Sequence, residues 1–521
     1  MSRSASEAVV EDGAILRNRC YIHKLPVEIL AQIFLAVLHA IPQNARFKAV
    51  VPLVLTHVCP IWCGAAIESK ALWTVIPIVS TSITRLYLKR SHPLTISVQY
   101  SYSKFTRRTR YADAFRCVLD DPTRVRELIH EDNWDDWFDE EEYEKQNEWD
   151  DEMFCRFPAP SLGKLQLVQL GAEVLRTRTF NDVFFPALID LRLDYCVLPS
   201  GNQPMTITTS SLTYLDLYHC ENFLAFLAEA ARHLSSLRGL KINEHFMAEP
   251  HHGALSPIEF SGSLRLLALY STSMTALSFF QASRIPLHST VHVTSIDNAR
   301  LEGPEEDIFA RETSGFRVAM LAVNVFDRIS QAVRAGYTSY CMTIADVQND
   351  ATEIKIFMRS PRRSTSVHDL DFDEPDQSCI TSLILAHRLR EYHIDQALTT
   401  LLKALAPIKT IPGLRTVPTL AISLSSLHQT AYQLVCERLS ECAPQTTEIA
   451  LGSPGLITVL GEAESLDVFP SLKMVSLTPD VAIDKHAIME ARGIRKGLRF
   501  VRQDLLAQFP DHSLPLENEM Y

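Results

Sequence analysis

Apolar residues near the N-terminus recur every four positions, which predicts a helix over residues 25–38. Three stripes run along it and leave a polar strip of only Glu28, Gln32 and His39. The stripes are Leu25, Ile29, Ile33 and Val37; Leu30, Phe34 and Leu38; and Val27, Ala31 and Leu35. A helix that is apolar on most of its circumference must be covered on several sides, either by the rest of its own domain or by a partner protein.

Prolines divide the next residues into short helices. Pro42 ends the first helix, Pro52 opens a second, and Pro60 starts a third, because proline is tolerated in a first helical turn and not in a helix interior. The third helix begins in the stretch VCPIWC, where Cys59 and Cys63 are four residues apart. With His57 they supply at most three ligands, and no second Cys/His pair lies at finger-like spacing, so we expect buried thiols and no zinc.

A leucine phrase of the form L-x-x-L-x-L then recurs. Its steps are 26, 24, 25 and 27 residues, which is the period of a leucine-rich repeat. The first leucines are Leu162, Leu188, Leu212, Leu237 and Leu264. Each L-x-L is expected to be a short strand with alternate side chains turned inward. Helical stretches follow some of these phrases, and such units must stack because one strand and one helix cannot bury their own apolar faces. The alternative is an ordinary α/β domain with leucine-rich strands.

Weaker units extend the pattern in both directions. The stretches 72–78 and 92–100 are rich in β-formers, and further strands are expected at 289–296, 379–387, 416–424, 446–453 and near 470. Helices are expected at 221–234 and 429–443. Residues 301–375 are expected to be irregular, with exposed insertions at 302–315 and 358–378, and residues 486–509 to form a capping helix. These elements predict an α/β fold, with short helices followed by an irregular repeat solenoid.

The charge of the chain is concentrated in one segment. Residues 131–152 hold thirteen acids and one lysine, and the whole chain of 521 residues carries a net charge of −12. The remaining residues are therefore neutral overall, which argues against nucleic acid as a partner. The acidic segment also holds three of the five tryptophans. We expect a solvated insertion; the alternatives are an anchor for a basic partner or a contact with residues 104–110.

Composition excludes several other classes. The eleven cysteines are scattered, residues 1–18 lack a signal-peptide core, and the apolar run 29–41 is too short and too polar to cross a bilayer. We expect a soluble cytoplasmic or nuclear protein without a membrane partner. No phosphate-binding loop, dinucleotide fingerprint, nucleophile elbow or zinc-protease motif occurs, so neither catalysis nor a cofactor is expected.

The N-terminal residues resemble the F-box of basidiomycete fungal proteins. LPVEILAQIF (25–34) is similar to its first part, and PLVLTHVCPIWC (52–63), followed by Leu72 and Trp73, is similar to the rest. Residues 86–98 also resemble the segment that usually follows the box, and leucine-rich repeats are a common addition. Two positions depart from the pattern: Cys63 stands where arginine is usual, and Pro60 falls inside the V-C-x-x-W turn.

The resemblance implies a non-catalytic substrate receptor of an SCF-type ubiquitin ligase, with the repeats holding an unknown target protein. The F-box would bind a Skp-type adaptor, and through it a cullin and a RING subunit. The residues that the resemblance places in adaptor binding are Leu25, Pro26, Ile29, Leu30, Ile33, Phe34, Pro52, Leu53, Val58 and Trp62. The alternative is a repeat-based interaction scaffold outside any ligase. Outward strand positions for target binding are Gln166, Arg192, Asp216, Lys241 and Ala268.

The expected organisation has six parts. They are a disordered N-terminus (1–20), the F-box (21–75), a linker with a first irregular repeat (76–127), the acidic insertion (128–155), the repeat solenoid (156–482), and a capping helix with a tail (483–521).

Overall fold

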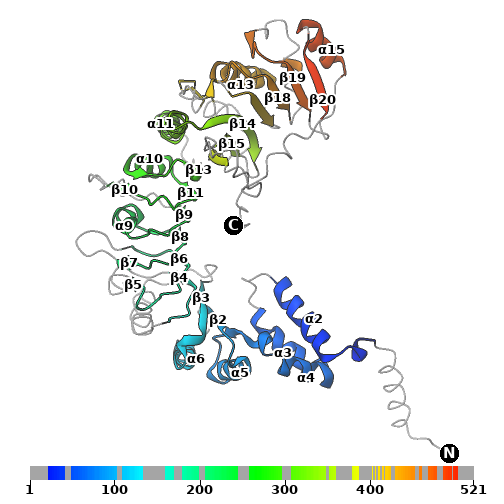
Figure 1. Ribbon diagram of the computed structural model, residues 1–521, viewed down its shortest axis with the longest axis vertical. Helices are drawn as coiled ribbons and strands as arrows, with labels where there is room; N and C mark the ends of the chain where they lie inside the picture. The colour runs from blue at the N-terminus through cyan, green and yellow to red at the C-terminus, as the bar shows by residue number, and fades with distance from the viewer. Residues whose placement is uncertain are drawn as a thin grey trace, which may run out of the picture. The chain divides into compact units, whose positions relative to one another are not determined.

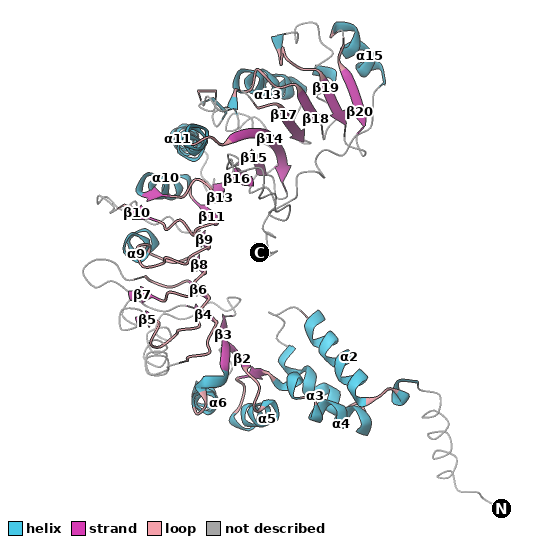
Figure 2. Ribbon diagram, in the orientation of Figure 1, coloured by secondary structure: helices cyan, strands magenta, loops and turns pink. Residues whose placement is uncertain are grey.

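A computed structural model describes most of the predicted elements, and its helices and strands are drawn in Figures 1 and 2. The described residues are 21–41, 48–102, 108–132, 159–168, 179–198, 206–244, 257–295, 307–347, 351–359, 378–386, 402, 405–406, 409–410, 414–415, 417–423, 429–451, 457–459, 467–477, 485–495 and 497–502. The chain divides into two compact units, residues 1–213 and 214–521. Both combine helices with mainly parallel strands, so the α/β class is confirmed.

The first unit begins with short helices separated as the prolines predict (Figure 2). They are η1 (Tyr21–Lys24), α2 (Val27–Ala40), η2 (Lys48–Val50), α3 (Val51–Thr56), α4 (Pro60–Glu68) and η3 (Lys70–Trp73). Pro26 lies just before α2, and Pro52 and Pro60 lie in the first turns of α3 and α4. Each proline thus occupies a position where its missing N–H leaves no helical hydrogen bond unmade.

A parallel sheet follows in the same unit, in the order β1-β2-β3-β4-β6. The strands are β1 (Val75–Pro77), β2 (Ile96–Tyr102), β3 (Val125–Asp132), β4 (Lys164–Val168) and β6 (Asp190–Asp194). Helices α5 (Thr81–Ser91) and α6 (Arg108–Leu119) connect the first three strands, and η4 (Pro122–Arg124) precedes β3. A small separate sheet pairs β5 (Thr179–Asn181) with β7 (Thr206–Thr208).

The second unit has a larger sheet in the order β8-β9-β11-β13-β16-β15-β14-β17-β18-β19-β20. Its strands are β8 (Tyr214–Tyr218), β9 (Gly239–Asn243), β11 (Leu266–Ser271), β13 (Thr290–Ser295), β14 (Thr338–Val347), β15 (Ala351–Arg359), β16 (Ser378–Ala386), β17 (Thr419–Ser423), β18 (Glu448–Leu451), β19 (Met474–Leu477) and β20 (Arg499–Arg502). A two-stranded sheet joins β10 (Ile258–Glu259) to β12 (Ser283–Arg284).

In the part of this second unit for which bounds are described, α9, α10 and α11 lie on one side of strands β8 to β13 (Figure 1). The helices with described bounds are α9 (Phe223–Ala230), α10 (Ser273–Ala282), α11 (Asp307–Arg334), α13 (Gln429–Cys442) and α15 (Lys485–Ile494). The helices expected at 221–234 and 429–443 are confirmed as α9 and α13.

Strands form where the leucine phrases predict them, because the alternating leucines fill continuous buried rows. In the second unit, Leu215, Leu240, Leu267 and Val291 are register partners on successive strands, and each is fully buried. The first leucine of each phrase, from Leu162 to Leu264, is also buried. Each strand is short, yet its inward side chains pack against those of the next strand, so burial is shared along the row.

Hydroxyl groups at the strand entries add a second regular link. Within the first unit, Ser211 Oγ donates to the Leu188 carbonyl oxygen at 2.8 Å. Within the second, Ser263 Oγ donates to Leu237 O at 2.8 Å and Ser289 Oγ to Leu264 O at 2.7 Å. Thr446 Oγ1 makes the corresponding bond to Val417 O at 3.2 Å. These bonds satisfy carbonyls that precede a strand and have no partner within it.

Four expectations about irregular regions are wrong. Residues 307–334 form one 28-residue helix, α11, although 301–375 was expected to be irregular and 302–315 to be an exposed insertion. In the same stretch, β14 and β15 pair antiparallel where irregular structure was expected. The expected capping helix 486–509 ends at Ile494 and is followed by strand β20. The acidic insertion was expected from residue 128, but residues 128–132 belong to β3.

Some predictions concern residues that the structure does not describe. Residues 1–20 and 133–155 lie outside the described residues, as do 103–107. None of the helices that the structure describes is both long and apolar enough to cross a membrane.

Candidate protein-binding face on the N-terminal helices

Helix α2 packs into the first unit by one stripe of its three. Leu30, Phe34 and Leu38 are buried, while Ile29, Ile33 and Val37 are exposed along the adjacent side of the same helix. Because the sequence is apolar on both sides, packing uses one side and leaves the other in contact with solvent. This is the observation on which the site is built.

The rings of Phe34 and Trp62 hold α2 against α4. Their centroids are 4.9 Å apart and their planes are inclined by 56°. Trp62 owes its position to the start of α4, where Cys59 Sγ accepts a hydrogen bond from the Trp62 N–H at 3.5 Å. Cys59 is half-buried and serves as the helix cap, so the expectation of a simple buried thiol at this position is corrected.

A second aromatic contact fixes the end of the helical segment. Trp73 is fully buried, and its Nε1–H donates to the Ala66 carbonyl oxygen at 2.7 Å. Its ring meets Tyr87 of α5 edge-on at 4.8 Å, and the Arg90 guanidinium lies over it at 4.1 Å. Burial raises the pKa of Tyr87 well above its usual range. The helices are therefore anchored to the adjoining β-α-β segment through Trp73.

The exposed apolar residues of the described chain gather on these helices. Nine large aliphatic side chains between residues 27 and 67 are 38–60% exposed, and we call them the apolar face. They are Val27, Ile29, Ile33, Val37, Val50, Val54, Val58, Ile61 and Ile67. Single exposed aliphatic residues are ordinary on a protein surface, whereas Ile29, Ile33 and Val37 follow one another at four-residue spacing on one side of α2 and form an exposed apolar stripe of the kind that a partner covers.

The ten residues expected to bind an adaptor divide into three groups. Pro26, Ile29, Ile33 and Val58 are exposed, and Leu25, Leu53 and Trp62 are half-buried. Leu30, Phe34 and Pro52 are buried, so a partner cannot reach them while the helices are folded. They support the apolar face from beneath. Sequence reasoning left out six members of the face: Val27, Val37, Val50, Val54, Ile61 and Ile67.

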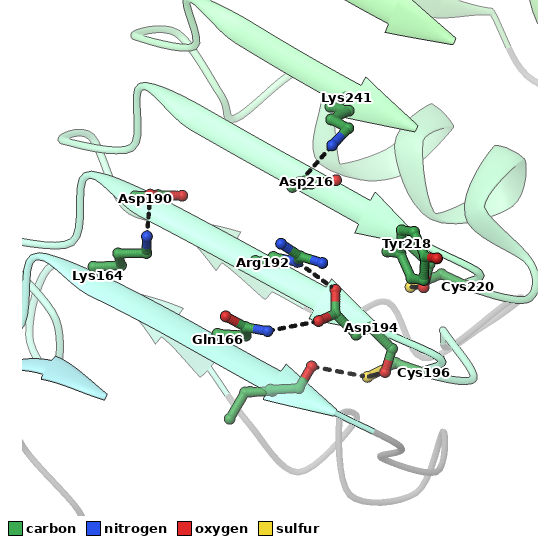
Figure 3. A network of polar contacts seen from close by, with 11 residues as sticks. Lys164, Gln166, Asp190, Arg192, Asp194, Cys196, Asp216, Tyr218, Cys220 and Lys241 are labelled. Atoms are coloured by element: carbon green, nitrogen blue, oxygen red, sulfur yellow. Dashed lines mark hydrogen bonds and ion pairs between the residues drawn. The ribbon is translucent and has the colours of Figure 1, made fainter. Parts of the chain in front are cut away.

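Polar side chains on the strands form a different surface (Figure 3). In the first unit, Lys164 Nζ lies 3.7 Å from Asp190. Asp194 accepts hydrogen bonds from Gln166 Nε2 at 2.7 Å and from Arg192 Nε at 2.8 Å. Burial raises the pKa of Asp190 above its ordinary value, and Lys164 and Arg192 oppose that shift.

The second unit carries a related pair on its own strands. Lys241 Nζ of β9 lies 3.8 Å from the buried carboxylate of Asp216 on β8, and Ala268 is the register partner of Lys241 on β11. Gln166, Arg192, Asp216 and Lys241 are thus engaged in contacts within their own units. Asp216 and Ala268 are also buried, so the expectation that these two side chains are open to a target is wrong. These strand charges neutralise one another, and they define no anionic or cationic ligand.

Among the described residues, no group of three or more histidines, cysteines and acids is placed to hold a metal ion. Compared with known proteins, the chain matches no family model and no curated protein.

Proposed function

We propose that the chain is a substrate-recognition subunit of an SCF-type ubiquitin ligase. Residues 21–75 would be an F-box that binds a Skp-type adaptor, and the leucine phrases would build a repeat solenoid that holds the target protein. The adaptor would connect the chain to a cullin and a RING subunit. The chain itself would supply no catalytic residue, because its contribution is to hold the target lysine near the charged E2 enzyme.

The apolar face is the observation that carries this proposal. An apolar helix face of this kind is a recurrent site for docking of a partner helix. The resemblance of residues 25–34 and 52–63 to an F-box supports the adaptor as that partner. Pro60, which departs from the usual pattern, lies in the first turn of α4, where it leaves the helix intact.

The test is co-purification of the full chain with a recombinant Skp-type adaptor. Ile29→Glu and Ile33→Glu place charges on the exposed stripe without touching the core, so the variant is expected to fold and to lose the adaptor. The control is Val183→Glu, which places the same charge at an exposed valine of the first unit outside the N-terminal helices. This variant is expected to retain the adaptor. Equal recovery of adaptor with both variants, or none with the unchanged chain, would overturn the proposal.

An interaction scaffold outside any ligase is the second candidate. Cys63 favours it, because a half-buried cysteine stands where the resemblance has arginine. Loss of a charged contact weakens binding to the adaptor. Cys63→Arg should then increase recovery of the adaptor if the ligase proposal is right, and should have no effect if the helices serve another partner.

A further inference from the structure

The end of the second unit is strongly basic, although the chain as a whole is acidic. Residues 485–502, which cover α15 and β20, contain six lysines and arginines and a single acid, Glu490. Arg492 and Arg499 are exposed, and so is Lys473, which directly precedes β19. The chain outside residues 131–152 is neutral overall, so this local excess stands out. We call the exposed side chains of Lys473, Arg492 and Arg499 the basic edge.

The basic edge lies beside the last strand of the sheet. β20 pairs in parallel with β19, from Met474 opposite Arg499 to Leu477 opposite Arg502. Among the strands that the structure describes, β19 is its only neighbour, and β20 is the outermost strand beside α15 (Figure 1). The outer side of such a strand presents backbone N–H and C=O groups in a row, which is the template for adding another strand.

Arginine side chains occur on both faces of this edge strand. Phe500 is half-buried, and the Arg492 guanidinium of α15 lies 5.5 Å from the centre of its ring. Arg499 is exposed and points to the opposite face, because successive side chains of a strand alternate. Arg495 is already engaged, since its guanidinium donates to the carbonyl oxygens of Val468 and Phe469. Arg492 and Arg499 are thus available to a ligand at the outer side of β20.

We propose that an extended acidic segment of a partner protein binds here by adding a strand beside β20. Backbone hydrogen bonds to the strand would supply affinity, and two acids at neighbouring positions, which point to opposite faces of the strand, would meet Arg499 on one face and Arg492 on the other. Nucleic acid also binds basic surfaces, but it makes no use of a row of peptide N–H and C=O groups. The combination of edge strand and charge therefore favours a peptide. This interaction is independent of the adaptor proposal and uses a different unit of the chain.

Three fluorescent peptides test the proposal with the full-length protein. The first repeats two glutamates followed by two valines, which places acids on both faces of a strand; the second has lysine in place of glutamate, and the third keeps the glutamates and replaces central valines with proline. The first should bind and should slow amide exchange in residues 499–502. The lysine peptide should not bind, and the proline peptide should bind at least about tenfold more weakly because it cannot pair as a strand. Equal binding of the proline peptide, tighter binding of a single-stranded oligonucleotide, or no binding at low salt would overturn the proposal.

Substitutions of single arginines test whether the peptide binds at the basic edge. Arg499→Gln should weaken the glutamate peptide by about fivefold, as expected for one exposed charge contact of about 1 kcal/mol. The control is Arg284→Gln, at an exposed arginine of β12 in the same unit, and it should leave the affinity unchanged. Arg492→Gln should weaken binding as well. Equal affinities of the Arg499 and Arg284 variants would contradict the assignment, and matching thermal melts would show that folding is not the cause.

Discussion

The ring of Tyr214 lies across Gly239 on the neighbouring strand, so close that a Cβ atom at position 239 would come within 2.6 Å of Tyr214 Cδ2. The two residues are register partners on β8 and β9. Because glycine has no side chain, the Tyr214 ring can lie close to the backbone at position 239. Any side chain at position 239 would have to displace that ring.

Gly239→Ala should therefore destabilise the second unit, by about 1–3 kcal/mol for an overpacked contact. Tyr214→Ala in the same chain should remove most of that cost, because the clash needs both groups. Urea unfolding of the two single variants and the double variant measures the coupling. Additive effects of the two substitutions would show that the close approach does not set the stability.

Phe34 is expected to be essential to the N-terminal helices because it joins α2 to Trp62 of α4. Replacement of this buried ring by alanine should cost about 3–5 kcal/mol. Amide exchange in α2 should accelerate strongly, whereas Ile33→Ala on the exposed stripe should leave it nearly unchanged. Slow exchange in the Phe34 variant would mean that α2 is held by other contacts.

Glu244 should make stability depend on pH. It is buried at the end of β9, and burial raises the pKa of its carboxyl from 4.5 to about 7, opposed by a hydrogen bond with Thr275. A folded pKa above the unfolded value means that the folded state holds the proton more tightly. The contribution of Glu244 to stability is therefore fully present below about pH 4.5 and is lost as the pH rises through about 7.

Glu244→Gln removes this titration and keeps a polar group for Thr275. The variant should exceed the original chain in stability at pH 8, on the order of 2 kcal/mol, and the difference should shrink at pH 5. Urea unfolding at the two pH values provides the measurement. A constant difference at both would contradict the linkage.

Thr446 tests the hydroxyl links at the strand entries. Its side chain is fully buried and donates to the Val417 carbonyl oxygen. Thr446→Val keeps the volume and leaves that carbonyl without its donor, which should cost about 1–3 kcal/mol. Thr446→Ser keeps the hydroxyl and should cost less. The reverse order in thermal unfolding would show that the methyl group matters more than the hydrogen bond.

The strands were predictable because their leucines alternate with period two and all turn to one side. The same reasoning missed α11, although its buried residues Val318, Leu321, Val325 and Ile329 follow helical spacing. The charged residues at its start favoured a loop, and the buried stripe named here begins only at Val318, eleven residues after the start of the helix. Strand β20 was missed because RFVR is short and continues a helical pattern across Gly497. In the structure α15 ends at Ile494, and Gly497, with a positive φ of 94°, lies in the turn before the strand.

The candidate face was only half predictable. Periodicity identified the apolar stripes of α2, but Ile29 and Leu30 are equally apolar, and only packing decides that Leu30 turns inward. The cap at Cys59 was likewise hidden, because a thiol at the start of a helix gives no hydropathy signal. The sequence indicates that a partner or a neighbouring element must cover α2, and the fold shows which side remains available.

Amide hydrogen exchange of the full chain, with and without a recombinant Skp-type adaptor, tests the central proposal most directly. We expect the adaptor to slow exchange in α2 and in residues 54–67, which carry the apolar face, and to leave the strands of the second unit unchanged. Unchanged exchange in α2 and in residues 54–67 at saturating adaptor would contradict the proposal that this face binds the adaptor.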